Sequence, residues 1–213
     1  MMQDRIQNRF LRSIPFASPH FLLLRELLRA PQAIGAICSS SQKLADRMAA
    51  CVDGDEDKWV IELGGGTGAI TQALLRRGIP ANRLIVIEKS ARLASHLSRR
   101  FPDVRIVQSD AADSTQVITK GMQVRAIVSG LPLRSLAAQA VDDITRAWAE
   151  ILEEEGRVIQ FTYAHYGESP WLRAGLIKAA SKTVWANIPP ARVEVFTMTP
   201  DITMPGTMAL HKA

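Results

Sequence analysis

The feature that most constrains this chain is the alternation of short apolar runs with segments of helical period. Runs of strand length occupy residues 59–63, 83–88, 104–108, 124–129 and 157–163. Strands that alternate with helices along a chain form a parallel sheet with helices on both faces. We therefore predict an α/β fold with a doubly wound, mostly parallel, Rossmann-like sheet. Two further β-rich runs, 183–187 and 191–198, predict an antiparallel C-terminal strand at the end of that sheet.

Caps and apolar spacing predict the helices. Ser39 and Gln42 have the spacing of a capping box, which would open a helix with Met48 on its buried side. Apolar residues recur at helical spacing over 135–152, which predicts one long helix there. Ser169 before Pro170 predicts the start of a last helix, extending over 170–177.

The composition favours one globular core. The 213 residues are 47% hydrophobic and 22% charged, which is enough apolar surface for a substantial interior. The two cysteines make neither a disulfide framework nor a CxxC pair, so we predict no metal and a reducing cytoplasm. Apolar runs stay below the roughly 18 to 20 residues that a membrane span requires.

Glycines stand at alternate positions after the first predicted strand. Gly64, Gly66 and Gly68 lie where the backbone must approach a ligand with no Cβ in the way. This pattern indicates a loop that binds a nucleoside cofactor. Gly64, Gly66 and Ala69 also fit a loose G-x-G-x-x-A, so a nicotinamide dinucleotide competes with S-adenosylmethionine.

Three carboxylates at strand ends favour S-adenosylmethionine. Glu62 precedes the glycines, where it would attract the amino group of the methionine part and repel a pyrophosphate. Glu88 ends the second strand, where a carboxylate accepts the ribose hydroxyls of either cofactor. Asp110 follows the third strand and would accept from an adenine amino group.

These residues resemble a known family, the soluble bacterial phospholipid N-methyltransferases, distant relatives of the ribosomal RNA adenine dimethyltransferases. The resemblance covers residues 34–198 and rests on Gly35 to Ile37 with Ser40 and Ser41, Glu62 to Gly68, Glu88, Ser129 to Leu133, Gln160 to Tyr163, and Asn187 to Ala191. The chain departs from the family at Gly65, where proline is more usual, and at Ser109, where glycine is usual.

The resemblance implies an enzyme with a Rossmann-like methyltransferase fold that uses S-adenosylmethionine to methylate phosphatidylethanolamine towards phosphatidylcholine. The departures leave room for another amino lipid, such as an ornithine lipid. The cofactor contacts predicted from the residues and the resemblance together are Ser40, Ser41, Glu62, Gly64, Gly66, Thr67, Gly68, Glu88, Lys89, Asp110, Ala111 and Ser129.

The bend after the fourth strand is predicted to hold the acceptor amine. Methyl transfer requires a neutral nitrogen in line with the S–CH₃ bond, and such positioning can supply about 7 to 11 kcal/mol of the barrier. In the stretch Ser129, Gly130, Leu131 and Pro132, the glycine permits close approach, the proline fixes the turn and exposed carbonyls would accept from the amine. Alternatively, the bend merely starts the next helix.

Aromatic residues near this bend bear on the acceptor. In the adenine methyltransferases the corresponding corner ends in an aromatic that stacks on a base, whereas here Leu133 favours a small head group. Tyr163 and Tyr166 follow the fifth strand and would attract an ammonium group, although Tyr163 also fits a core aromatic. No residue stands out as a general base.

The N-terminal segment, residues 1–30, is predicted to be amphipathic, helical and separate from a methyltransferase domain at 31–213. It holds five arginines against Asp4 and Glu26, so 5 − 2 = +3 of the net charge of +5 lies there. It would bind an anionic phospholipid surface at the inner face of the cell membrane, or cover the cofactor as a lid. Aromatics make up only 6% of the chain, so no nucleic acid partner is expected. An RNA adenine methyltransferase and an inert cofactor-binding membrane protein remain as alternatives.

Overall fold

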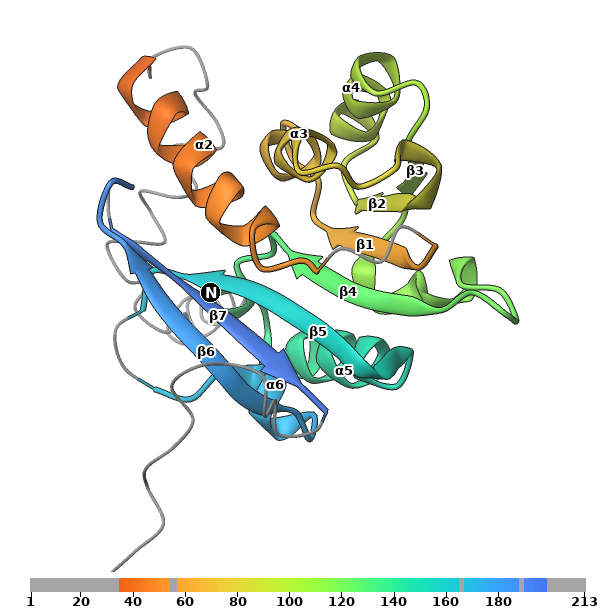
Figure 1. Ribbon diagram of the computed structural model, residues 1–213. Coiled ribbons are helices and arrows are strands. Elements are labelled where there is room, and N and C mark those ends of the chain that lie inside the picture. The colour runs from red at the N-terminus through yellow and green to blue at the C-terminus, as the bar shows by residue number, and fades with distance from the viewer. Residues whose placement is uncertain (1–34, 54–56, 165–166, 188–189, 199–213) are drawn as a thin grey trace, which may run out of the picture. The chain divides into compact units, whose positions relative to one another are not determined.

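A computed structural model describes residues 35–53, 57–164, 167–187 and 190–198, and of residues 35–41 it describes only the helical backbone. Its centre is a seven-stranded sheet in the order β3-β2-β1-β4-β5-β7-β6 (Figure 1). The strands are β1 Trp59–Leu63, β2 Leu84–Glu88, β3 Arg105–Gln108, β4 Val124–Ser129, β5 Leu152–Thr162, β6 Ile177–Val184 and β7 Ala191–Thr197.

The strand directions confirm the predicted fold class. Strands β1 to β5 pair in parallel, whereas β7 is antiparallel to both of its neighbours, β5 and β6. The chain order reverses between β1 and β4, and ligands of open α/β sheets bind at such a switch point, outside the carboxyl ends of the strands. The predicted N-terminal helical segment lies outside the described residues.

Helices cover both faces of the sheet. On one face lie α2 Gly35–Ala49, α3 Ala69–Arg76 and α4 Ala91–Arg100, and on the other lie α5 Ala138–Ala149 and α6 Pro170–Arg173 (Figure 1). In the described part of the chain, short 3₁₀ turns join the elements: η2 Ala81–Arg83, η3 Ala111–Asp113, η4 Thr115–Val117 and η5 Leu133–Ser135. Within the described ranges, no helix has the length and apolar character that a bilayer span requires.

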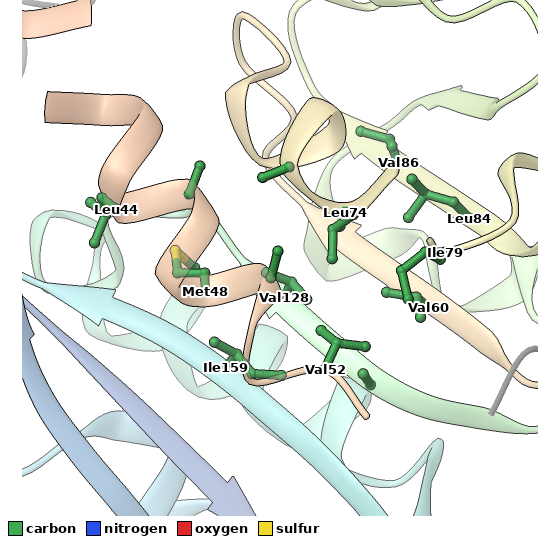
Figure 2. Packing of buried hydrophobic residues seen from close by; sticks show 14 of the residues in the cluster. Leu44, Met48, Val52, Val60, Leu74, Ile79, Leu84, Val86, Val128 and Ile159 are labelled. Atoms are coloured by element: carbon green, nitrogen blue, oxygen red, sulfur yellow. The ribbon is translucent and has the colours of Figure 1, made fainter. Parts of the chain in front are cut away.

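Alternate residues of the strands build two cores. On one face, Met48 of α2 and Leu74 of α3 pack with alternate strand residues such as Val60, Val128 and Ile159 (Figure 2). On the opposite face, the α5 and α6 side of the sheet is filled by Trp148, Trp171 and Phe196, all fully buried. Because the parallel strands are buried on both faces, they appear in the sequence as continuous apolar runs.

Two helix boundaries differ from the sequence prediction. The helix expected to open at Ser39 begins at Gly35, so Ser39 lies inside α2 and is not its cap. The helix expected over 135–152 is only Ala138–Ala149, because residues 133–135 form η5 and Leu152 already belongs to β5. Leu152 pairs with Val124, which extends β5 by five residues before the predicted start at Arg157.

The last helix and the strand after it also differ. The helix predicted over 170–177 ends at Arg173, because Gly175 adopts a φ of 91°, outside the helical region. Leu176 is buried, and Ile177 already pairs with Thr197 of β7. The edge strand is therefore β6 Ile177–Val184, which overlaps the predicted run at 183–187 only at its first two residues.

Candidate active site

The glycine loop joins β1 to α3 at the carboxyl edge of the sheet. Gly64, Gly66 and Gly68 have φ angles of 79°, 54° and 86°, a region that side chains with a Cβ rarely adopt. A Cβ at Gly66 would meet no atom within 4 Å, so the loop faces open space at this position. Gly68 directly precedes α3, whose first amides point towards the loop. The predicted loop is confirmed as a strand-to-helix turn.

The bend after β4 lies against this loop. The amide of Gly130 donates to the carbonyl of Leu63, 2.8 Å away, and a Cβ at Gly130 would lie 2.8 Å from the carbonyl oxygen of Gly64. Conversely, a Cβ at Gly64 would lie 2.7 Å from Cδ2 of Leu131. Two glycines thus allow two backbone segments to touch, which brings the predicted cofactor loop and the predicted acceptor bend together.

Glu62 is a fully buried acid directly behind the loop. Its Oε2 accepts from the hydroxyl of Thr71 at 2.7 Å, while its buried Oε1 has no hydrogen-bond partner among the described residues. Burial raises the pKa of Glu62 to about 8, an effect that the bond from Thr71 reduces and the nearby Glu88 reinforces. A cation beside Oε1 would therefore satisfy an orphaned acceptor and favour the ionised form.

Glu88 links the glycine loop to the start of α4. Its Oε2 accepts from the amide of Gly66 at 2.9 Å, and its Oε1 accepts from the amide of Ser90 at 2.8 Å. Each carboxylate oxygen keeps a further lone pair, so Glu88 can still accept from ligand hydroxyls. The carboxylate therefore orders the loop as well as standing at the position predicted for a ribose contact.

The remaining predicted cofactor residues differ in their surroundings. Lys89 pairs with Asp110 at 2.6 Å, and this bond lowers the pKa of the Asp110 carboxyl. Asp110 also caps η3 by accepting from the amide of Ala112 at 3.1 Å. Ala111 is buried, and its carbonyl accepts from the indole of Trp148 at 2.7 Å.

Two predicted cofactor contacts, Asp110 and Thr67, already make hydrogen bonds within the protein. The side chain of Asp110 is shared between Lys89 and its own turn, so a role towards adenine remains a prediction. Thr67 is exposed at the loop, and its carbonyl accepts from Arg100 at 2.8 Å. Ser40 and Ser41 lie on α2, but their side chains are outside the described part of the structure.

The acceptor bend is held by a residue that the sequence reading left out of the site. Gln160 of β5 donates from Nε2 to the carbonyl of Leu131 at 3.0 Å and accepts from the indole of Trp171 at 3.3 Å. The Leu131 carbonyl also accepts from the amide of Leu133 at 2.9 Å. That carbonyl is thus engaged twice within the protein, and acceptance from the amine by the carbonyls of the bend remains a prediction.

What the bend still offers is a buried hydroxyl. Ser129 is fully buried, and its Oγ has no hydrogen-bond partner among the described residues. The register places Ser129 between Leu63 and Gln160 on the neighbouring strands. An unsatisfied buried hydroxyl beside the bend is costly unless a ligand or water completes it, which fits the predicted role of Ser129.

Tyr163 is half-buried beyond the end of β5. Its ring meets Phe161 edge to face at 5.5 Å between centroids, and it packs against the core on the α2 and α3 side. Burial raises the pKa of the Tyr163 hydroxyl, and a side-chain hydrogen bond with Asn187 lowers it. A cation-binding role for Tyr163 remains a prediction, and Tyr166 lies outside the described residues.

The fit to the predicted cofactor can be tested on these contacts. An orphaned, buried carboxylate oxygen on Glu62 suits an ammonium group, and the open space at Gly66 suits a ligand that approaches the backbone. Glu62, Gly66 and Glu88 would hold S-adenosylmethionine, which supplies an electrophilic methyl group on its sulfonium. In the described ranges, no group of three His, Cys, Asp or Glu residues could hold a metal ion.

Comparisons with known proteins show the class of enzyme. A family model described as a methyltransferase domain matches residues 60–156. The ornithine lipid N-methyltransferase of Singulisphaera acidiphila is 31% identical over 157 residues, which cover 71% of this chain and 79% of that protein. The ribosomal RNA small subunit methyltransferase A of Sphingopyxis alaskensis is 36% identical over 119 residues, 51% of this chain but only 42% of that protein.

Solved structures share the fold at low identity. The magnesium protoporphyrin IX methyltransferase of Synechocystis PCC 6803, solved with bound S-adenosylmethionine, has a TM-score of 0.63 and 14% identity, and the match covers 86% of this chain and 93% of that one. Fold and site together define an S-adenosylmethionine-dependent methyltransferase. The chain belongs to the family of N-methyltransferases that includes the ornithine lipid enzyme.

Proposed function

We propose that the enzyme methylates the head-group amine of a membrane amino lipid, with ornithine lipid as the first acceptor to test. The observation that carries this proposal is the 31% identity to an ornithine lipid N-methyltransferase over 79% of that protein. Phosphatidylethanolamine, the acceptor first expected from the sequence, offers the same primary amine on a flexible head group and stands second.

The bend favours a small amine over a nucleobase. Leu133, which stands where the adenine enzymes resembled by this chain carry a stacking aromatic, is 4% exposed and packs in the α5 core. It therefore offers no free face to a base. Ser129 supplies an unsatisfied hydroxyl near the bend, which can accept from an N–H of the amine or donate to its lone pair.

Positioning is the main catalytic task in this proposal. The amine must reach the reaction as a neutral nitrogen aligned with the methyl group, and a rigid bend raises the fraction of bound acceptor in that geometry. Gly130, in contact with Gly64, keeps the bend within reach of the cofactor loop. The proton of the amine leaves to water, because no described side chain has a defined role as its base.

The acceptor can be identified by label transfer. The full chain is incubated with S-adenosylmethionine carrying a labelled methyl group and with ornithine lipid, phosphatidylethanolamine or ribosomal RNA in separate reactions. We expect label in the ornithine lipid, and a comparison of initial rates orders the two lipids. Label in RNA alone, or in no acceptor, would overturn the proposal.

The N-terminal segment is part of this proposal. Residues 1–30 would hold the enzyme at the inner face of the cell membrane by an amphipathic basic helix. Sedimentation with vesicles that contain phosphatidylglycerol tests this role. Deletion of residues 1–16 should reduce the bound fraction, and unchanged binding would assign the segment to a lid instead.

A further inference from the structure

The turn between β6 and β7 exposes a tryptophan. Trp185 is 76% exposed, whereas the other large apolar side chains exposed in the described residues, Leu136, Ile177 and Met198, are 38%, 43% and 40% exposed. Trp148 and Trp171 are fully buried in the same domain. An indole that remains in water forgoes a large hydrophobic gain, and tryptophan is enriched where one end of the side chain meets an apolar phase and the other meets water.

The turn lies at the same edge of the sheet as the active site. Since β7 is antiparallel to both β5 and β6, β6 runs in the same direction as β4 and β5. Its carboxyl end, after Val184, is therefore at the edge that bears the Gly130 bend, and Figure 1 shows the β6–β7 connection beyond the arrowhead of β5.

A buried asparagine fastens the turn to the site. Asn187 is 2% exposed, and its side chain makes a hydrogen bond with Tyr163, which follows β5. Two residues earlier, Trp185 is left in solvent. The turn is thus held by Asn187 while Trp185 points into solvent. The exposed tryptophan therefore lies on a fixed turn and not on a loose loop.

The strands that carry the turn have a positive surface. Residues 177–197 contain Lys178, Lys182 and Arg192 against one acid, Glu194. Lys182 is exposed, and the side chains of Lys178 and Arg192 are 33% and 23% exposed, whereas the Glu194 carboxylate that pairs with them is 2% exposed. The cations therefore reach solvent while the compensating carboxylate does not.

We propose that the enzyme docks on the interface of an anionic phospholipid bilayer through Trp185 and through Lys182, which lies on β6. This contact turns the active-site edge of the sheet towards the lipid head groups. This inference rests on the lipid acceptor proposed above. A head-group amine stays tethered to the bilayer, so the edge that holds the Gly130 bend must face the membrane. Tryptophan is enriched at membrane interfaces, and lysines near them are attracted to anionic lipids.

Fluorescence quenching tests the contact directly. Vesicles of phosphatidylglycerol and acyl-brominated phosphatidylcholine quench only tryptophans that enter the interface, and residues 1–34 contain none of the four tryptophans. We expect quenching in the full chain and its loss in Trp185→Phe. Trp59→Phe is the matched control, because Trp59 begins β1 at the opposite edge, and it should keep the quenching. Equal quenching in Trp185→Phe would overturn the proposal.

Activity on two forms of the acceptor separates docking from chemistry. With ornithine lipid in vesicles, Trp185→Ala should slow methylation about tenfold, since the side chain contributes to interfacial binding. With a short-chain ornithine lipid below its micelle concentration, the same variant should match the wild-type rate. Ile177→Ala, an exposed apolar residue at the opposite edge, should leave both rates unchanged.

The outcomes distinguish this inference from the proposed function. If no lipid is methylated but Trp185 is quenched, the acceptor assignment fails and the docking surface stands. If ornithine lipid is methylated while Trp185→Ala acts on vesicles as fast as the wild type, the acceptor stands and the docking surface fails. Lys182→Glu should weaken binding to anionic vesicles. An unchanged affinity of this variant for anionic vesicles would remove Lys182 from the docking surface.

Discussion

Nε2 of Gln160 donates to the carbonyl of Leu131 across 3.0 Å and so fixes the acceptor bend to strand β5. The same side chain accepts from Trp171 at 3.3 Å, which restricts its rotation. Gln160 thus holds the bend from a neighbouring strand, and we predict that it positions the acceptor indirectly.

Replacing Gln160 with leucine should loosen the bend. We expect kcat to fall about tenfold, because misplacement of an acceptor by a fraction of an ångström is costly, while the Kd for S-adenosylmethionine stays constant. Steady-state kinetics and calorimetry measure the two quantities. Trp171→Phe is the control, because it removes the bond to Gln160 but not the one to Leu131, and should retain most of kcat. A weakened cofactor affinity in Gln160→Leu would contradict a role confined to the bend.

Replacing Gly130 with alanine should act through contact rather than through backbone strain. The new Cβ would lie 2.8 Å from the carbonyl of Gly64, so either the loop or the bend must move. We expect a folded protein with strongly reduced activity. Gly78→Ala is the comparison, since Gly78 has a φ of 98° but open space around it. That variant should lose about 1 to 2 kcal/mol of stability and keep its activity.

Glu62 should make the free energy of unfolding depend on pH. Its pKa is about 8 in the folded protein and near 4.5 as an ordinary carboxyl, so between these values the folded state binds the extra proton. The cofactor-free protein therefore loses stability as the pH rises from 4.5 to 8, by about 5 kcal/mol at most. Urea unfolding at pH 5.5 and 8.5 measures how the free energy of unfolding changes with pH. Glu62→Gln should remove the part of this change that comes from Glu62. The same pH dependence in Glu62→Gln and the wild type would show that another group binds this proton.

Glu88 should matter more to cofactor binding than an exposed ion pair outside the site does. Glu88→Ala removes the acceptor of the Gly66 amide and the predicted ribose contact, so we expect the Kd for S-adenosylmethionine to rise about tenfold to a hundredfold. Arg76→Ala, which breaks only the exposed pair with Asp46, should change it less than about twofold. Equal effects of the two substitutions would argue against a direct contact by Glu88.

The parallel sheet and the glycine loop were predictable because their signals are local. Buried strands such as Val124–Ser129 are continuous apolar runs, and alternate glycines after a strand such as the one ending at Leu63 are typical of a strand-to-helix cofactor loop. Boundaries set by tertiary contacts were not predictable. Leu152 joins β5 because it pairs with Val124, and the exposed residues of β6 carry no alternating pattern that would have revealed their pairing with β7.

The candidate site also contains residues that were predictable from the sequence and one that was not. Glu62 and Glu88 were found because strand ends in this fold converge at one edge. Gln160 was missed as a site residue because its partner, Leu131, offers a backbone carbonyl that has no signature in the sequence. The proline at 132 suggested exposed carbonyls, but only the fold shows that the nearest one is already occupied.

The close approach of Gly130 to Gly64 limits how enzymes of this design can change their acceptor. No side chain fits between the two backbones, so residue 130 has no freedom to vary with the molecule being methylated. Under the proposed function, selectivity for one amine or another therefore lies in the positions that follow, from Leu131 onwards, and in the segment after β5. The machinery that delivers the methyl group can then stay constant while the acceptor pocket diversifies around it.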